Sequence, residues 1–301
     1  MKNKSFSKIS VSIATALFAL CFAAAAFAQE TPTHESGQKS ITFKVMTINI
    51  RHSKDFWEER FPLIADEIVR LKPDIIGLQE VQIDIKQSKT LLKLIEELSG
   101  ADSLKYEKYE HLKTGYEMHG GEGVAIFSRY PIIKKSFADL KHGRPVVFSR
   151  IAVADGLTID FYNTHLHNAG PEVTFPQAQK LVEFEKKNDA GFITFLTGDM
   201  NSYDDYPSVR HFVENGFVDT YYAVHGEETP ILGNTCPVIM SKENVQQNFE
   251  KRIDFVFMKT PPGTETQVKI VESDVYFKNL DERGLYPSDH LGVMTTFEIK
   301  Y

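Results

Sequence analysis

The sequence predicts a mixed α/β fold in which two β-sheets pack face to face and helices cover their outer sides. Strand-like and helix-like segments alternate near both ends of the chain. Between them, strand candidates follow one another with short connections, as in an antiparallel meander. Alternating segments favour helices layered on a sheet, whereas a meander favours antiparallel neighbours, so we expect mixed sheets with helices outside.

The first part of the chain alternates strand and helix. Residues 41–50 alternate apolar and polar side chains like a strand. Residues 61–71 carry apolar side chains at helical spacing, and Pro73 stands just beyond them. A buried apolar run predicts a second strand at 74–80, and a second helix is expected at 91–98.

The rest of the chain contains more strands than helices. Short apolar runs predict strands at 104–110, 123–127, 132–137, 146–154, 157–165, 192–198, 253–258, 268–277 and 291–299. Apolar residues grouped on one face predict helices at 175–187 and 209–215, the second of which ends before Gly216.

The first 28 residues are predicted to be a secretory signal peptide. A basic start precedes an almost wholly apolar stretch from Val11 to Ala26, and Ala26-Phe27-Ala28 fits a small-x-small cleavage site. A membrane anchor is the alternative, but the apolar stretch is short for a membrane span. We therefore expect a secreted or periplasmic protein, with a flexible segment over 29–40 and one catalytic domain over 41–301.

The charge and cysteine content narrow the class of protein. The formal net charge is −7, and it becomes more negative when the lysines of the signal peptide are removed. A protein that grips nucleic acid normally shows a basic face, so this balance argues mildly against long DNA as the substrate. Cys236 is the only cysteine left after cleavage, which excludes an internal disulfide.

Four strand-like runs end on a polar group that can bind a metal ion or move a proton. These groups are Asn49, Glu80, His165 and Asp199, with Asn201 two residues beyond the last. A soluble domain rarely places such groups at strand ends unless they meet at one site. The pattern therefore indicates an enzyme.

Gly198-Asp199-Met200-Asn201 is the strongest local signal. A carboxylate at Asp199 can orient or deprotonate water, and the Asn201 amide can donate to a phosphate oxygen. The alternative is an Asx-turn after a core strand.

Glu80 suits a hard divalent cation, which prefers oxygen donors, although a carboxylate can also cap a strand-to-loop turn. Asn49 by itself is also compatible with ordinary turn chemistry.

The last third of the chain adds further candidates. Asp254 stands within an otherwise apolar strand, where an isolated carboxylate is costly and needs a partner. It could orient the ring of His290 and hold its imidazolium, while Asp289 points to a metal. The alternative is that His290 only packs in a turn.

His165 and His167 stand two residues apart and could bind zinc together. Neither a cysteine pair nor a His-Glu-x-x-His helix supports zinc, and the other candidate ligands are oxygens. We therefore expect His165 to donate a hydrogen bond to a phosphate and His167 to be peripheral.

Seven short motifs, in this order, resemble the endonuclease/exonuclease/phosphatase superfamily of pancreatic-type deoxyribonucleases, abasic-site endonucleases, inositol polyphosphate phosphatases and neutral sphingomyelinases. The similarity runs from about residue 43 to residue 297. The motifs are Thr47-Ile48-Asn49, Gly77-Leu78-Gln79-Glu80-Val81, Gly123-Val124-Ala125-Ile126-Phe127-Ser128-Arg129, Asn163-Thr164-His165-Leu166, Gly198-Asp199-Met200-Asn201, Arg252-Ile253-Asp254 and Ser288-Asp289-His290.

The resemblance implies a four-layer α/β sandwich and magnesium-dependent cleavage of a phosphoester P–O bond, with Mn²⁺ as the alternative metal. At the matching positions, Glu80 would bind the metal with help from Asn49 and Asp289. Asn49 would also contact the substrate.

The resemblance also implies roles for the other strand-end groups. Asp199 would align or deprotonate the attacking water, and Asn201 and His165 would hold phosphate oxygens. His290, oriented by Asp254, would stabilise charge on the phosphoryl group during in-line displacement.

Two features bear on the substrate. Many relatives carry an aspartate after the His-Leu of the fourth motif, where this chain has His167-Asn168, so contacts there stay open. The stretch 233–236 resembles the sphingomyelinase-like and secreted branches more than the DNA-repair branch, although its role stays open. We expect a small phosphodiester or phospholipid headgroup as the substrate, no stable membrane insertion and a monomer.

Two alternatives to a phosphodiesterase stay open. One is an extracellular or periplasmic endonuclease or exonuclease that acts on nucleic acid, which a basic groove beside Glu80 would favour. The other is a non-catalytic binding protein on the same fold, which would lack a base or a metal ligand.

Overall fold

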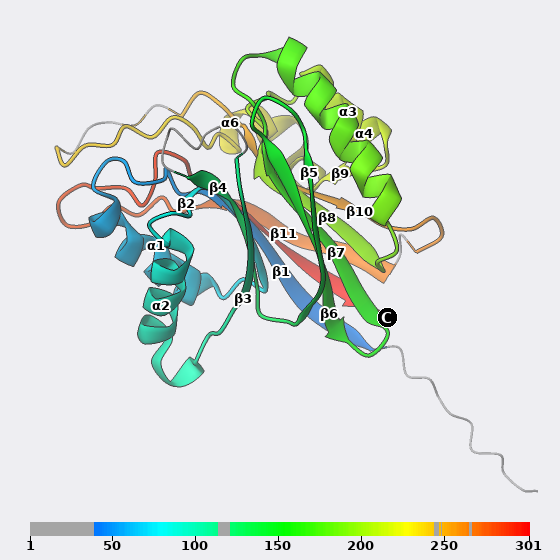
Figure 1. The fold of residues 1–301 in the computed structure, drawn as a ribbon, viewed down its shortest axis with the longest axis horizontal. Coiled ribbons are helices and arrows are strands. Elements are labelled where there is room, and N and C mark those ends of the chain that lie inside the picture. Colours follow the sequence, from blue (N-terminus) through cyan, green and yellow to red (C-terminus); the bar gives the residue numbers. More distant parts are fainter. Residues whose placement is uncertain (1–38, 114–120, 244–246, 248, 265–266) are drawn as a thin grey trace, which may run out of the picture. The chain divides into compact units, whose positions relative to one another are not determined.

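The computed structural model describes residues 39–301 except 114–120, 244–246, 248 and 265–266. The predicted signal peptide and nearly all of the segment 29–40 lie outside the described residues, so both stay predictions. The described residues belong to one compact unit, which contains two six-stranded sheets with helices on their outer sides (Figure 1).

The first sheet contains both ends of the described chain. Its strands, in spatial order, are β11 (Val268–Tyr276), β12 (Gly292–Lys300), β1 (Ser40–Asn49), β2 (Ile75–Gln82), β4 (Glu122–Ser128) and β3 (Glu107–Leu112). Strands β1 and β2 run parallel, and the other neighbours are antiparallel. The sheet is therefore mixed, as predicted.

The second sheet repeats this arrangement. Its strands, in spatial order, are β5 (Ile132–Asp139), β6 (Pro145–Ala154), β7 (Leu157–His165), β8 (Ile193–Asp199), β10 (Asp254–Lys259) and β9 (Val218–Asp219). Strands β7 and β8 are parallel, and the other neighbours are antiparallel. Each sheet thus has one parallel pair of strands. Within each pair, the carboxyl ends of the two strands lie side by side.

Helices cover the outer face of each sheet (Figure 1). Helices α1 (Trp57–Leu71) and α2 (Gln87–Ser99) bury apolar side chains against the first sheet, where Ile64 and Ile68 of α1 meet Met46 of β1. Helices α3 (Pro171–Asn188) and α4 (Pro207–Glu214) do the same on the second sheet, where Leu181 and Phe212 lie in one cluster with Phe257.

The third apolar cluster fills the space between the sheets. Its side chains come from the inward faces of both sheets and include Phe43, Ile126, Phe161, Phe195 and Phe297, all fully buried. With a helical layer on each outer face, this gives the four-layer α/β sandwich that was predicted.

Five short elements were not predicted from the sequence, and helices α1, α2 and α3 each begin four residues before their predicted starts. Strand β9, helix α5 (Thr220–His225) and helix α6 (Thr229–Leu232) are two, six and four residues long, too short to produce a recognisable apolar period. The short 3₁₀ turns η1 (Gly100–Asp102) and η3 (Gly226–Glu228) were also missed.

Helix α1 begins at Trp57, four residues before the predicted start. Its first turn contains Arg60, which is fully buried and hides the apolar period. The guanidinium donates to six backbone carbonyl oxygens, from residues 50, 51, 52, 54, 55 and 287. Burial lowers the pKa of Arg60 to about 10.

A polar contact joins the two sheets inside the apolar core. The fully buried Asn163 of β7 donates through Nδ2 to the carbonyl oxygens of Leu78 and Ala125 in the first sheet, both at 2.9 Å. Its Oδ1 accepts from Gln79 Nε2 at 2.7 Å and from Thr197 Oγ1 at 3.2 Å. All four hydrogen-bonding positions of this amide are thereby satisfied.

The sheets approach each other closely beside this amide, at Gly77. A Cβ atom there would lie 2.2 Å from Thr197 Oγ1 and 2.7 Å from Asn163 Oδ1. Glycine is therefore required for steric reasons, and the contact fixes how the sheets meet near the ends of β2, β7 and β8.

We predict that Asn163→Asp lowers the free energy of unfolding by about 3 kcal/mol or more, because a carboxylate oxygen would face the two carbonyl oxygens of the first sheet. Urea unfolding followed by circular dichroism measures this loss. Asn279→Asp, at an exposed position, is the matched control and should change stability by no more than about 0.5 kcal/mol. Equal stabilities of the two variants would contradict the inter-sheet role of Asn163.

Candidate active site

The carboxyl ends of the two parallel strand pairs bring the predicted site residues together. His165 at the end of β7 is paired with Asp199 at the end of β8, and Asp254 at the start of β10 is paired with Asp199 from the other side. Asn49 ends β1, and Glu80 lies near the end of β2. The sheet register thus groups His165, Asp199 and Asp254, whereas Asn49 reaches Asp199 from the other sheet through its side chain.

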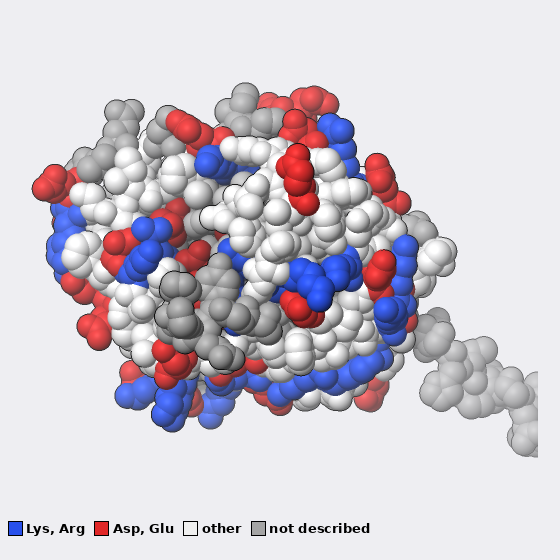
Figure 2. Space-filling model, turned by 45° about the horizontal axis from the view of Figure 1, so that its top comes forward, with Lys and Arg blue, Asp and Glu red and all other residues white. Residues whose placement is uncertain are grey.

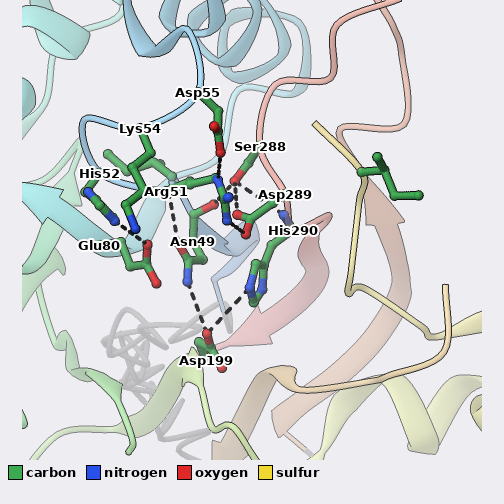
Figure 3. A network of polar contacts seen from close by, with 12 residues as sticks. Asn49, Arg51, His52, Lys54, Asp55, Glu80, Asp199, Ser288, Asp289 and His290 are labelled. Carbon is green, nitrogen blue, oxygen red and sulfur yellow. Dashed lines mark hydrogen bonds and ion pairs between the residues drawn. The ribbon is translucent and has the colours of Figure 1, made fainter. Parts of the chain in front are cut away.

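Asp199 is the centre of the site. Its carboxylate is almost completely buried, and Oδ2 accepts from Asn49 Nδ2 at 3.1 Å. His165 Nε2 and His290 Nε2 lie 3.4 Å and 3.8 Å from the same oxygen. Oδ1 accepts from the backbone N–H of Asn201 at 2.9 Å. Figure 3 shows Asn49, His290 and Asp199 pointing toward one another.

Burial governs the protonation of this carboxylate. Burial raises the pKa of Asp199 to about 7, although the nearby His290 charge and the hydrogen bonds from Asn201 and Asn49 oppose the rise. A carboxyl group with a pKa near neutrality accepts a proton more readily than an ordinary aspartate.

Asp254 orients His290. The fully buried Asp254 accepts through Oδ2 from Thr235 Oγ1 at 2.6 Å, and His290 Nδ1 lies 2.9 Å from the same oxygen. A carboxylate accepts only, so Nδ1 carries a proton and Nε2 faces Asp199. Burial alone would lower the pKa of His290, but Asp254 and Asp199 hold it well above its ordinary value.

The pKa of His165 is shifted in the opposite direction to that of His290. Burial, followed by the charges of Arg144 and Lys113, lowers its pKa well below the ordinary value, so the ring is neutral. Lys113 Nζ lies 3.3 Å from His165 Nδ1 and can only donate. Nδ1 is therefore the acceptor, and Nε2 carries the proton on the side of Asp199.

Asn201 follows the end of β8 in a left-handed conformation, with φ 44°. Its Nδ2 donates to the carbonyl oxygen of Leu166 at 3.0 Å, which holds the amide beside Asp199. The sequence suggested an Asx-turn as the alternative for this segment. The Asn201 N–H to Asp199 Oδ1 bond has that form, so turn and site coincide.

The three predicted metal ligands lie in different surroundings. Glu80 has φ 54°, and its Oε2 lies 3.7 Å from His52 Nε2. Asn49 Oδ1 accepts from the Arg51 backbone N–H at 2.9 Å and keeps a second lone pair. Asp289 is paired with the Arg51 guanidinium, which is also paired with Asp55.

Two groups of side chains have ligand atoms that all lie within 4.8 Å of one another. One comprises Asp199, Asp254 and His290, whose facing atoms already hydrogen-bond or pair with each other. The other comprises Glu80, Glu122 and His165, in which Glu122 is paired with the Lys113 ammonium. Among the carboxylates of these two groups, Glu80 has the weakest contacts with other described side chains.

Sequence reasoning missed several residues of the site. Arg51 and His52 follow β1, Lys113 and Glu122 flank the segment 114–120, and Thr235 precedes β10. The stretch 120–123 was interpreted as a hairpin turn, but much of the connection lies outside the described residues. Glu122 had a local signal, a carboxylate between two glycines at the start of an apolar run, and Thr235 lies in the stretch 233–236 whose role was left open.

A cavity of about 340 Å³ lies beside His290. Its lining residues are Asn168, Gly170, Asn201, Tyr203, Tyr206, Cys236, Lys251, Ile253 and His290. The stretch 233–236, whose role the sequence left open, therefore contributes both a wall of the cavity and the Thr235 hydroxyl that holds Asp254. His167 lies outside this lining and packs against His142, with ring centroids 5.8 Å apart.

Among the described residues, no helix combines the length and the apolar character needed to cross a membrane.

Two of the proteins that are similar to the chain in sequence are described as sphingomyelinases, one of them as putative. A putative neutral sphingomyelinase of Caenorhabditis elegans is 25% identical over 267 residues, which cover 75% of this chain and 58% of that protein. A sphingomyelinase of Mycobacterium tuberculosis is 27% identical over 154 residues, which cover 50% of this chain and 30% of that protein. The chain thus spans little more than half of the first relative and about a third of the second.

Solved structures show the same fold. An endonuclease/exonuclease/phosphatase family protein of Bacteroides thetaiotaomicron superposes with a TM-score of 0.67 at 21% identity, covering 87% of this chain and 96% of that one. The human Nocturnin catalytic domain gives 0.66 at 18% identity, with the same coverages. A Bacteroides thetaiotaomicron mannosyl-6-phosphatase gives 0.62 at 22% identity, covering 85% and 99%.

The sequence pattern of one family matches most of the chain. The model of the "Endonuclease/Exonuclease/phosphatase family" matches residues 46–290, a range that contains every strand-end residue described above. The four-layer fold and the grouping around Asp199 agree with that match. The chain therefore belongs to the endonuclease/exonuclease/phosphatase family.

Proposed function

We propose that this protein is a metal-dependent hydrolase that cleaves a phosphoester P–O bond, chiefly in phosphodiesters, by in-line attack of an activated water. One observation carries the proposal. An amide, two imidazoles and a backbone N–H from both sheets surround the buried carboxylate of Asp199. Such a set can hold a water and a phosphoryl group side by side.

Asp199 is the group proposed to take the proton from water. Its pKa of about 7 suits a general base near neutral pH, and the Asn49 and Asn201 hydrogen bonds fix its orientation. Neither donor can accept the proton from Asp199, so the proton stays on the carboxyl group until it exchanges with solvent.

The two histidines are proposed to act on the phosphoryl group in different ways. His290, held as an imidazolium by Asp254, would stabilise the negative charge that develops during displacement. His165, held neutral beside Lys113, would donate from Nε2 to a phosphate oxygen. Asn201 keeps a second amide N–H besides the one bound to Leu166, and this could serve the same purpose.

The residues around Glu80 fit a hard divalent cation such as Mg²⁺ or Mn²⁺. Glu80 offers a carboxylate without a short protein contact among the described residues, and Asn49 Oδ1 keeps a free lone pair. Asp289 fits less well as a direct ligand because Arg51 binds it, so we propose that it orients Arg51 beside the metal site. The bound cation would polarise a phosphoryl oxygen and neutralise charge in the transition state.

A small phosphodiester, including a phospholipid headgroup, is the proposed substrate class. The sphingomyelinases named above support this class, and so does the distribution of charge. On the face drawn in Figure 2, lysine and arginine side chains are interspersed with acidic ones. A nuclease that follows a long backbone would be expected to gather basic residues along one groove.

We expect Asp199→Asn to lower kcat for hydrolysis of bis-p-nitrophenyl phosphate by about 10²–10⁴-fold, because the amide cannot accept the proton of water. The rate of p-nitrophenol release in saturating Mg²⁺ measures this. Asp155→Asn, in the exposed turn between β6 and β7, is the control and should keep the wild-type rate. Full activity of the Asp199 variant would rule out the assigned base.

We expect EDTA to abolish hydrolysis and added Mg²⁺ or Mn²⁺ to restore it. In Glu80→Gln the Mg²⁺ concentration for half-maximal rate should rise at least about tenfold, a loss of about 1.4 kcal/mol in binding free energy. The Mg²⁺-dependent shift in melting temperature provides a second readout that does not require turnover. Glu97→Gln, on the exposed side of α2, should behave as the wild type, and an unchanged Mg²⁺ requirement in Glu80→Gln would contradict the assignment.

We also propose that the protein is exported and cut after Ala28, on the basis of the basic start and apolar stretch in the sequence. Mass spectrometry of the protein recovered outside the cytoplasm should give a chain that begins at Gln29. A chain that keeps Met1 and stays in the cytoplasm would disprove the export proposal without affecting the catalytic one.

A further inference from the structure

The cavity beside His290 borders the proposed phosphoryl site. Asn201 and His290, which are both proposed to act on the phosphoryl group, also line this cavity of about 340 Å³. Glu80 lies on the opposite side of Asn49 from His290 (Figure 3). A diester bound between them can therefore direct one substituent toward Glu80 and place the other in the cavity. The lining of the cavity then selects the second substituent.

Several polar groups of this lining are available to a bound molecule. The amide of Asn168, the hydroxyl groups of Tyr203 and Tyr206 and the ammonium of Lys251 form no hydrogen bond or ion pair within the part of the chain that the structure describes. Asn201 uses one amide N–H on a carbonyl oxygen and keeps the other. The cavity can thus offer hydrogen bonds to several hydroxyl groups at once.

The charge of the lining disfavours a cationic substituent. Lys251 supplies an ammonium, and no carboxylate is among the described residues that line the cavity. The carboxylates of Asp204, Asp205 and Glu250 line a second cavity instead. A quaternary ammonium in the cavity beside His290 would therefore meet a like charge without a compensating one.

Two tyrosine rings add flat apolar surface to these polar groups. Tyr203 and Tyr206 lie edge to face, with ring centroids 5.1 Å apart and an angle of 80° between their planes. Tyr203 is 37% exposed, so part of its ring is accessible. Ile253 is the one aliphatic side chain among the described lining residues, so an alkyl chain would contact mainly polar groups. A cyclic polyol suits the cavity better, because its ring presents C–H groups on its faces and hydroxyl groups at its edge.

We propose that this cavity binds a neutral polyhydroxylated ring, a sugar or a cyclitol, that is esterified to the scissile phosphate, and that Lys251 excludes cationic groups from it. The inference rests on the proposed function, because it concerns a substituent of the same phosphoester. The tyrosine rings pack on a C–H face, while the Asn168 amide and the Lys251 ammonium donate to hydroxyl groups. The substrate is thereby narrowed from phosphodiesters in general to esters of cyclic polyols, and choline esters are disfavoured.

Two chromogenic diesters with the same scissile bond test this selection. p-Nitrophenyl myo-inositol 1-phosphate carries a neutral polyhydroxylated ring, and p-nitrophenyl phosphocholine carries a quaternary ammonium. In the wild type, kcat/KM should be at least about tenfold higher for the inositol ester. In Lys251→Glu this ratio should fall at least about tenfold, because a carboxylate takes the place of the ammonium.

Lys269→Glu is the matched control for this pair of substrates. It makes the same change of charge at an exposed position of β11, at the end of the first sheet that lies away from Asn49. Its ratio should equal that of the wild type. A wild type that hydrolyses the choline ester as well as the inositol ester, or a ratio that Lys251→Glu leaves unchanged, would overturn the inference and leave the proposed function intact.

Binding of the corresponding monoesters provides a readout that needs no turnover. Isothermal titration calorimetry in Mg²⁺ should show that the wild type binds myo-inositol 1-phosphate at least about tenfold more tightly than phosphocholine. Tyr203→Leu should weaken binding of the inositol ester at least about threefold, because it removes one ring of the pair. Tyr222→Leu, at an exposed position outside this cavity, is the control and should bind as the wild type does.

The two sets of measurements separate the cavity from the chemistry. Equal binding of the two monoesters, or unchanged binding in Tyr203→Leu, would contradict the inference. If neither diester is hydrolysed while myo-inositol 1-phosphate binds with the expected preference, the proposed function fails and the assignment of the cavity stands.

Discussion

Burial of the Asp199 carboxylate is the constraint on which the site depends. A carboxylate removed from water is costly unless donors or cations surround it, and Asp199 obtains them from Asn49, His165, His290 and the Asn201 backbone. Asn49 belongs to one sheet and His165 to the other. The carboxylate is therefore satisfied only when the two sheets are packed, and folding and assembly of the site are the same event.

The polar contact between the sheets inside the core also helps to assemble the site. Asn163 and Gln79 join the two sheets, and they stand two residues before His165 and one residue before Glu80. A shift of either strand by one residue would turn its site residue to the opposite face. The network therefore holds the register in which both residues point into the site, and Gly77 allows the close approach that it needs.

The buried Arg60 and Arg144 differ in the hydrogen-bond acceptors that surround them. Arg60 is satisfied by backbone carbonyl oxygens and holds the segment after β1, which carries Arg51 and His52. Arg144 has buried nitrogens without such acceptors among the described residues. Arg60 and Arg144 are buried to a similar extent. They therefore differ in their hydrogen-bond acceptors and not in their exposure to water.

Most of the secondary structure follows from local patterns. Side chains that are apolar at every second or every third to fourth position predicted the main strands and helices, and family motifs predicted the layers. The exceptions have physical reasons. The start of α1 was hidden by a buried arginine that bonds to loop carbonyls, and β9, α5 and α6 are too short to show a period.

By itself, the sequence determined which strands end in reactive groups, because a strand end is a local property of alternation and turn chemistry. Only the tertiary structure decided which of those groups meet. Asn49 and Asp199 are 150 residues apart, and Lys113 has no local feature that marks it. Arg51 similarly pairs with Asp289 only after loops from opposite ends of the chain come together. Such pairings arise from the packing of two sheets, and packing brings together residues whose spacing along the chain carries no periodic signal.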